Sequence, residues 1–429
     1  MKNNNEIATE STAGEKHVDA LVDQAWEDRS GQSERILALA TDAIERAKQI
    51  GYEAGVARAT VCIAVAHFHA GRWRDARLAG RSVTSLIPAD DSEWRYRLVT
   101  VLAAVAMQLD DVEQSGPLLL QSLAIAKELG DARKLAIAHG NIAAYYFFQS
   151  LYERSLQHAQ VAIECYTELE DWTGVSRGLK TVGDVYKNLG RTREAFENYN
   201  RSVDAARRGG NELDIAAKLV ALAIFEIDFG LYREAVRHTD EAHDIFFRLG
   251  NDYHIGQTLS TASTIYAQLH DLPKALELRR QALDAHRRVG YSRMECEHLY
   301  NIASILAELG QYDEAIATHE SAIAIAEDRG EEPASARALA SFGDTLRRVG
   351  RLDDATVHLQ RAVEILIRIG DVRAVASKIK LAEVYIDRSL ANEAIEILSR
   401  ANEALTETQL PLRSNVARLL ALAHRLRGE

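Results

Sequence analysis

The sequence predicts an all-α protein made of stacked helical hairpins, because small residues return every 40 positions along most of the chain. A fixed period of this length is typical of a solenoid, in which each unit buries its apolar face against its neighbours. Two glycine series lie half a period apart, and an alanine series keeps the same step. The members are Gly130, Gly210, Gly250, Gly290, Gly330 and Gly370; Gly190, Gly230, Gly310 and Gly350; and Ala195, Ala235, Ala275, Ala315 and Ala355.

In chain order, we expect a disordered polar tail over residues 1–16 and then a single solenoid over 17–429. About ten helical hairpins succeed one another, and an amphipathic helix over 412–427 caps the stack. The expected units are 17–50, 57–88, 94–129, 136–169, 176–209, 216–249, 256–289, 296–329, 336–369 and 375–408.

The unit 176–209 shows how each hairpin is specified. Its first helix, 176–189, carries apolar residues at three- and four-residue steps, which is the period of one helix face. Gly190 is expected to end that helix in a left-handed turn, and 193–208 forms the second helix. Asn211 then supplies an N-cap for the next helix. Equivalent caps are expected from Asp131, Asn251 and Asp371.

Small residues also recur where paired helices must touch. Because a larger side chain would overpack such a joint, these positions predict close helix contacts. One site on the first helix holds Ala143, Gly183, Ala223, Ser263, Ala303, Gly343 and Ala382, and one on the second helix holds Ala162, Ser202, Ala242, Ala282, Ala322, Ala362 and Ala401.

The spacing Gly183-x2-Tyr186, then Ala195-x3-Tyr199 and the small Ser202, resembles the tetratricopeptide repeat pattern. The resemblance covers almost the whole chain, and it implies a right-handed superhelix whose first helices line a concave face that takes a peptide. The 40-residue period is similar to the long repeats of kinesin light chains, LGN-like adaptors and sensor regions of bacterial regulators.

The family register places a set of side chains in that concave groove, where they would bind a peptide. These are Asn141, Phe147, Phe148, Arg177, Lys180, Asp184, Lys187, Asn188, Ile224, Ile227, Asn301, Arg337, Asp344, Arg347 and Arg348. Asparagine suits an extended backbone because its amide both donates and accepts hydrogen bonds. The aromatic pair of the set, with Ile224 and Ile227, would form a hydrophobic pocket or, equally, extra core packing.

Two basic clusters, one on 176–189 and one on 336–349, each share one helical face. Such a face can clamp a carboxylate or an acidic motif. The alternative is that these residues are solvated and paired with Asp184, Asp344 and neighbouring acids. Both interpretations remain open from the sequence.

Composition narrows the function classes. With 51 basic and 63 acidic residues, the net charge of −12 disfavours general nucleic-acid binding. We expect no membrane span, no metal site and no cofactor, and the dispersed Cys62, Cys165 and Cys296 suit a reducing cytoplasm. Enzyme motifs such as H-E-x-x-H, G-x-S-x-G and the Walker loop do not occur.

Two functions therefore remain in view. The first is a cytoplasmic interaction scaffold that binds a peptide or a partner-protein segment in the groove. The second is a peptide-sensing module that controls an output enzyme or a transcription factor in trans. An enzymatic function has no support in the sequence.

Overall fold

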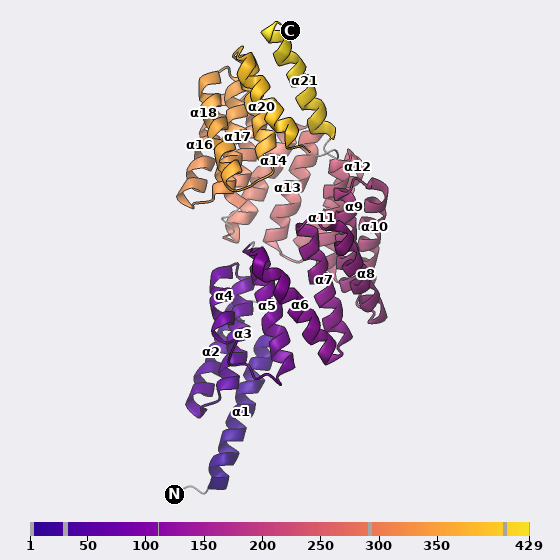
Figure 1. The fold of residues 1–429 in the computed structure, drawn as a ribbon, viewed down its shortest axis with the longest axis vertical. Helices are drawn as coiled ribbons and strands as arrows, with labels where there is room; N and C mark the ends of the chain where they lie inside the picture. The colour runs from indigo at the N-terminus through magenta and orange to yellow at the C-terminus, as the bar shows by residue number, and fades with distance from the viewer. Residues whose placement is uncertain (1–3, 29–32, 110, 291–293, 406–409, 429) are drawn as a thin grey trace. The chain divides into compact units, whose positions relative to one another are not determined.

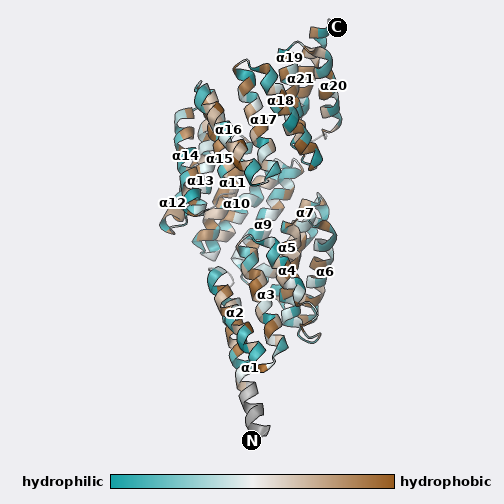
Figure 2. Ribbon diagram, turned by 90° about the vertical axis from the view of Figure 1, so that its left-hand side faces the viewer, coloured by the Kyte–Doolittle hydropathy of each residue, from teal (hydrophilic) through white to brown (hydrophobic). Residues whose placement is uncertain are grey.

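The structure is a computed structural model that describes residues 4–28, 33–109, 111–290, 294–405 and 410–428. These residues form twenty-one α-helices and no strand, so the expected all-α fold is confirmed (Figure 1). Hydrophobic and hydrophilic residues alternate around individual helices (Figure 2), as amphipathic packing requires. Among the described helices, none has the length and apolarity needed to cross a bilayer.

The chain divides into two compact units, Met1–Gly209 and Gly210–Glu429. The helices of the first unit are α1 (Asn4–Glu27), α2 (Ser33–Ile50), α3 (Glu53–His69), α4 (Trp73–Ser82), α5 (Ser92–Gln108), α6 (Val112–Leu129), α7 (Ala132–Phe148), α8 (Tyr152–Glu168), α9 (Trp172–Asn188) and α10 (Thr192–Gly209).

The helices of the second unit are α11 (Glu212–Asp228), α12 (Tyr232–Arg248), α13 (Asp252–Gln268), α14 (Leu272–Arg288), α15 (Glu295–Glu308), α16 (Tyr312–Asp328), α17 (Glu332–Arg348), α18 (Leu352–Arg368), α19 (Ala374–Asp387), α20 (Ala391–Glu403) and α21 (Leu410–Arg427).

Each odd-numbered helix from α1 to α19 packs against the even-numbered helix that comes after it, and several pairs of successive odd-numbered helices also touch. In the first unit α1 contacts α3, α3 contacts α5 and α7 contacts α9. In the second unit α11 contacts α13, α15 contacts α17 and α17 contacts α19. We call the side of each unit formed by these leading helices the odd-helix wall.

Left-handed residues separate the helices at a regular step. Gly190 has a φ of 70°, as expected for a residue that ends a helix. Where the series lacks glycine, the equivalent residue adopts the same conformation, as Glu170 does with a φ of 52°. The backbone geometry of the turn is therefore kept even when the residue that favours it is absent.

The N-caps match the expected pattern with one difference. The side chains of Asp131, Asn211 and Asn251 accept hydrogen bonds from backbone N–H groups of the helices that they precede. Asp371 instead accepts from the backbone N–H and the guanidinium of Arg373, and α19 begins only at Ala374. Its carboxylate therefore closes a turn ahead of the helix.

One cap that the sequence pattern did not reveal moves a helix start. Asp171 accepts a hydrogen bond from the backbone N–H of Gly174, and α9 begins at Trp172, four residues before the expected start at 176. Helix α9 is therefore one turn longer at its N-terminal end than the sequence pattern indicates.

Near the N-terminus of the chain, helix α1 extends from Asn4 through most of the segment expected to be a disordered tail. Val18, Val22 and Ala25 of α1 are buried, and helix propagates from such an anchored segment at little cost.

The small residues of both series are buried, and the serines among them also hold the helices together. The Ser263 hydroxyl donates to the Ala275 carbonyl across the α13–α14 joint at 2.7 Å. The Ser202 hydroxyl donates to the Ser176 carbonyl across the α9–α10 joint at 2.7 Å. Small size and a short cross-helix hydrogen bond therefore act at the same place.

We predict that replacing Ala322 with leucine lowers the free energy of unfolding by about 1–3 kcal/mol, because this side chain is fully buried in α16 against its neighbours. Ala317→Leu on the exposed face of the same helix is the control and should leave stability within about 0.5 kcal/mol of the parent. Urea unfolding followed by circular dichroism measures both, and equal midpoints for the two variants would contradict a tight joint.

Candidate functional site

A hollow of about 250 Å³ opens between α7, α8 and α9 in the first unit, and we call it the α7–α9 hollow. It brings together three of the residues that the sequence placed in the groove, which are Asn141, Arg177 and Lys180. Ile137 and Tyr166 supply part of its apolar wall. The lining of the hollow thus combines polar side chains with an apolar surface, which is the usual composition of a ligand pocket.

The polar side chains that line this hollow differ in whether they already have hydrogen-bond or ion-pair partners. The side-chain amide of Asn141 is half-buried and has no hydrogen-bond partner among the described residues. Arg177 lies 5.8 Å from the centre of the Tyr166 ring and donates to its hydroxyl at 3.4 Å. Lys180 is paired with Asp184 at 2.7 Å. The amide of Asn141 therefore keeps its donor and acceptor available within the described part of the chain.

The remaining groove candidates of α9 are mostly engaged with their own helix. Asp184 accepts hydrogen bonds from Lys180 and from the Tyr199 hydroxyl, the latter at 2.6 Å. The Asn188 amide donates to the Asp184 carbonyl at 2.9 Å, and Lys187 is half-buried near the end of the helix. Within the basic cluster of α9, Lys180 is thus neutralised by Asp184.

The aromatic residues at the end of α7 lie apart from this hollow. Phe147 packs against Phe148 and Tyr152, with ring centres 5.6 and 6.2 Å apart. Phe148 is 72% exposed and lines a second hollow, of about 360 Å³, together with Met107 and Val112. Asn141 and Phe148 therefore belong to different hollows.

In the second unit a hollow of about 370 Å³ is lined by residues of α11, α13, α14 and α15, and we call it the α11–α15 hollow. Ile224 and Ile227, both expected in the groove, form part of its apolar wall. The side chains of Asp228, Ser260, Thr261, Thr264, Arg279, His286 and Glu297 also line it.

Arg279 is the residue of this hollow that the sequence pattern did not single out. It is only 7% exposed, although it is a charged side chain on the second helix of its unit. Arg279 occupies the site of the family pattern that Tyr199 holds two 40-residue repeats earlier and that Leu359 holds two repeats later. An arginine at that site is the signal that aligning the units by their 40-residue step would have found.

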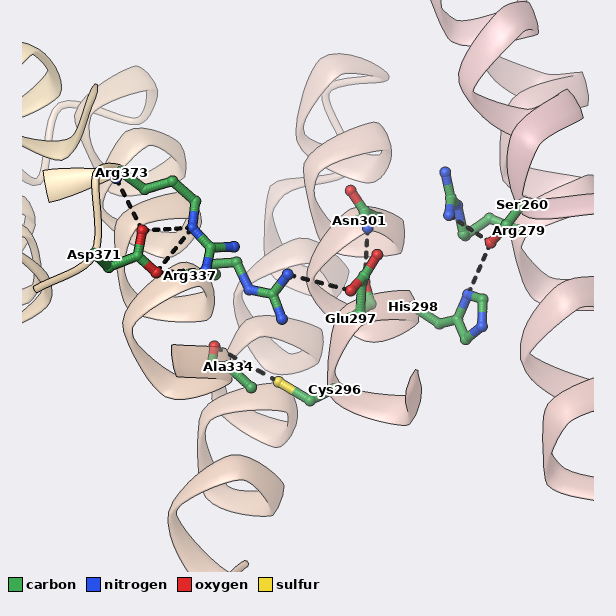
Figure 3. A network of polar contacts seen from close by, with 10 residues as sticks. All are labelled: Ser260, Arg279, Cys296, Glu297, His298, Asn301, Ala334, Arg337, Asp371 and Arg373. Atoms are coloured by element: carbon green, nitrogen blue, oxygen red, sulfur yellow. Dashed lines mark hydrogen bonds and ion pairs between the residues drawn. The ribbon is translucent and has the colours of Figure 1, made fainter. Parts of the chain in front are cut away.

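A chain of hydrogen bonds holds Arg279 (Figure 3). Its Nη1 donates to the Ser260 hydroxyl at 2.7 Å, which lies 3.4 Å from His298 Nδ1. His298 Nε2 meets His286 Nδ1 at 2.7 Å, and His286 Nε2 meets the Tyr253 carbonyl at 3.0 Å. One proton arrangement satisfies every link, in which each neutral histidine donates from Nε2 and accepts at Nδ1.

Burial keeps these histidines neutral. It lowers the pKa of His298 to about 3, and the charge of Arg279 adds to the effect. Burial also lowers the pKa of His286 and that of Arg279. Because neither histidine carries charge at neutral pH, the guanidinium is the cationic member of this chain.

The basic cluster of α17 is paired with acids, as the second of the two interpretations expected. Arg347 lies 3.0 Å from Asp387 and 3.6 Å from both Asp344 and Glu383. Arg348 lies 3.2 Å from Asp344. Arg347 therefore bridges α17 and α19, Arg348 pairs within α17, and both arginines have acidic partners.

Arg337 and Asn301 are engaged as well (Figure 3). Arg337 is paired with Glu297 at 3.3 Å and lies 5.9 Å from the centre of the Tyr300 ring. The Asn301 amide donates to the Glu297 carbonyl at 2.8 Å, within its own helix. Asn301 thus differs from Asn141, although both occupy the same place in the repeat.

No cluster of three or more potential metal ligands occurs among the residues that the structure describes. The three cysteines are free thiols. Burial raises the pKa of the Cys296 thiol to about 11, and its Sγ lies 3.9 Å from the Ala334 carbonyl. Cys296 therefore behaves as a small buried side chain.

Comparison with known proteins agrees with this architecture. The model of the MalT-like TPR region matches residues 233–429, and a tetratricopeptide repeat model matches 97–168 and 135–208. A model of anaphase-promoting complex subunit 5 matches residues 186–247. The human tetratricopeptide repeat protein 29 is 24% identical over 172 residues, which are 40% of this chain and 35% of that protein. The chain thus aligns with about a third of the length of this relative.

Three solved structures share the fold at low sequence identity. The apo quorum sensor NprR from B. thuringiensis has a TM-score of 0.56 at 12% identity and covers 82% of this chain and 99% of its own. Aspartyl phosphate phosphatase F from Bacillus subtilis has a TM-score of 0.55 at 14% identity and covers 81% and 94%. A Rap protein complexed with Competence and Sporulation Factor has a TM-score of 0.50 at 14% identity and covers 87% and 99%.

The fold and the repeat pattern define a helical-repeat scaffold of the kind that presents binding surfaces. This chain is a tetratricopeptide-type repeat protein.

We predict that stability falls as the pH is lowered from 6.5 toward 3, because the unfolded chain then binds protons that the buried histidines of the folded protein do not. His319 has a pKa lowered to about 3 by burial, so it contributes a slope of up to ~1.4 kcal/mol per pH unit in that window and none above it. His319→Gln should remove the part of the pH dependence of stability that His319 contributes.

The measurement is the urea midpoint between pH 7.5 and 4.5. The exposed His270→Gln variant serves as the control and should keep the parental slope. A parental slope in the His319→Gln protein would show that this histidine does not resist protonation in the fold.

Proposed function

We propose that this protein binds an extended peptide or a segment of a partner protein at the odd-helix wall. The observation that carries the proposal is the α7–α9 hollow, where the unpartnered amide of Asn141 stands beside Arg177 above an apolar floor. An amide with both donor and acceptor available matches a peptide group, which offers one of each. The likeness to a Rap protein complexed with Competence and Sporulation Factor supports the same proposal.

Two forms of this function differ in the effect that binding has on the protein. A scaffold holds its shape and joins partners, whereas a sensor changes conformation and acts on an output protein in trans. The fold that this chain shares with the quorum sensor NprR favours keeping the sensor as the second candidate. The paired state of Arg337, Arg347 and Arg348 gives no support to an acidic partner at α17.

We predict that Asn141→Ala weakens peptide binding by roughly fivefold to tenfold, since it removes one or two hydrogen bonds to the bound backbone. The probe is a fluorescent random octapeptide pool, from which binders are selected and measured by polarisation. Asn188→Ala is the matched control, because that amide already bonds within its own helix. Equal affinities for the two variants would place the peptide elsewhere, and a pool without any binder would reject the proposed function.

We predict that a selected octapeptide changes the small-angle scattering profile if the protein is a sensor. A scaffold should give superimposable profiles with and without the peptide at saturating concentration. The Asn141→Ala protein, measured at the same peptide concentration, separates an effect of the bound peptide from an effect of the solution.

A further inference from the structure

The guanidinium of Arg279 is buried with donors to spare. A guanidinium carries five N–H groups, of which two donate to Ser260 Oγ at 2.7 Å and to Thr264 Oγ1 at 3.0 Å. Its Nε is buried and has no partner. No carboxylate among the described residues forms an ion pair with it.

This state is costly for a charged side chain that is only 7% exposed to water, because a buried cation is normally paired with an acid. The hydroxyls and histidines around Arg279 accept or relay hydrogen bonds, but they are neutral. They fix the position of the guanidinium, and the charge of Glu297 acts on it without forming an ion pair. Burial accordingly lowers the pKa of Arg279.

By contrast, Arg337 and Arg347 on the odd-numbered helix α17 are neutralised. Arg337 is paired with Glu297 and Arg347 with Asp387. Glu297 also lines the α11–α15 hollow, yet its carboxylate is turned to Arg337 at 3.3 Å (Figure 3). The acid that could have balanced Arg279 is therefore already engaged.

We propose that the α11–α15 hollow takes a carboxylate of a peptide bound in the second unit, which pairs with Arg279 while Ile224 and Ile227 cover a neighbouring apolar side chain. The inference rests on the proposed function and names the ligand group that it requires in the second unit. A carboxylate fits better than a dianion such as a phosphate group, because Asp228 and Glu297 line the same hollow and would repel a second negative charge.

The carboxylate can come from the C-terminus of the peptide or from an aspartate or glutamate side chain, and three octapeptide pools distinguish these sources. The first has a free C-terminus and no acidic residue, the second is C-terminally amidated with one internal glutamate, and the third is amidated without any acid. The full-length protein is measured against each pool by fluorescence polarisation.

We predict that binders come from the first or the second pool and that Arg279→Gln weakens them by roughly tenfold to a hundredfold, the range for a charge-assisted hydrogen bond. Arg280→Gln is the matched control, since Arg280 is the adjacent residue and is exposed and paired with Glu314 at 2.7 Å. It should leave affinity unchanged. Circular dichroism establishes that both variants are folded.

A measurement on the parent protein keeps the test independent of how the variant folds. N-acetylglycine should displace the selected peptide, whereas its amide, N-acetylglycinamide, should not. Equal binding of the third pool, or equal displacement by the two compounds, overturns the carboxylate site and leaves the proposed function standing. If no pool binds at all, both proposals fail.

Discussion

Close approach of paired helices is the constraint on which the rest of this structure depends. At Gly343 an added Cβ would lie 2.5 Å from Leu359 Cγ, so α17 and α18 meet with no room for a side chain. At Gly183 the nearest atoms of Tyr199 would lie 3.3 Å away, and the joint of α9 and α10 is slightly looser. Joints this tight hold α9 to α10 and α17 to α18, and several successive odd-numbered helices within a unit also touch.

The same packing explains how an arginine comes to be buried. One site on the second helix is buried in each of these hairpins, and Tyr199, His319 and Leu359 hold it at 40-residue steps. Arg279 occupies the equivalent place, and Ser260 and Thr264 of α13 replace the apolar contacts with hydrogen bonds. A buried packing position thereby places a charged side chain at the wall of the α11–α15 hollow. Burying that charge lowers the stability of the fold, and a bound anion would offset the loss.

Charge distribution on the odd-helix wall depends on which acids stand one repeat away. Arg347 forms ion pairs with Glu383 and Asp387 on α19, and Arg337 forms one with Glu297 on α15. These ion pairs therefore link neighbouring repeats. The sequence shows three basic residues on one face of 336–349, but it does not show their distances from acids about forty positions away. For this reason the sequence left a clamp open as one interpretation of the α17 cluster, whose arginines have ion-pair partners within α17 and on α15 and α19.

The sequence by itself determined the all-α repeat, the left-handed turns such as Gly190 and the buried small positions such as Ala322, because each depends on residues close together in the chain or on the repeat step. It also placed Asn141, Ile224 and Ile227 at hollows through the family register. Only the tertiary structure decided that, among the described residues, Asn141 has no hydrogen-bond partner while Asn301 is engaged, and that Arg279 is buried without an ion-pair partner. Hydrogen bonding and ion pairing act over a few ångströms between helices, and no pattern along one chain records those distances.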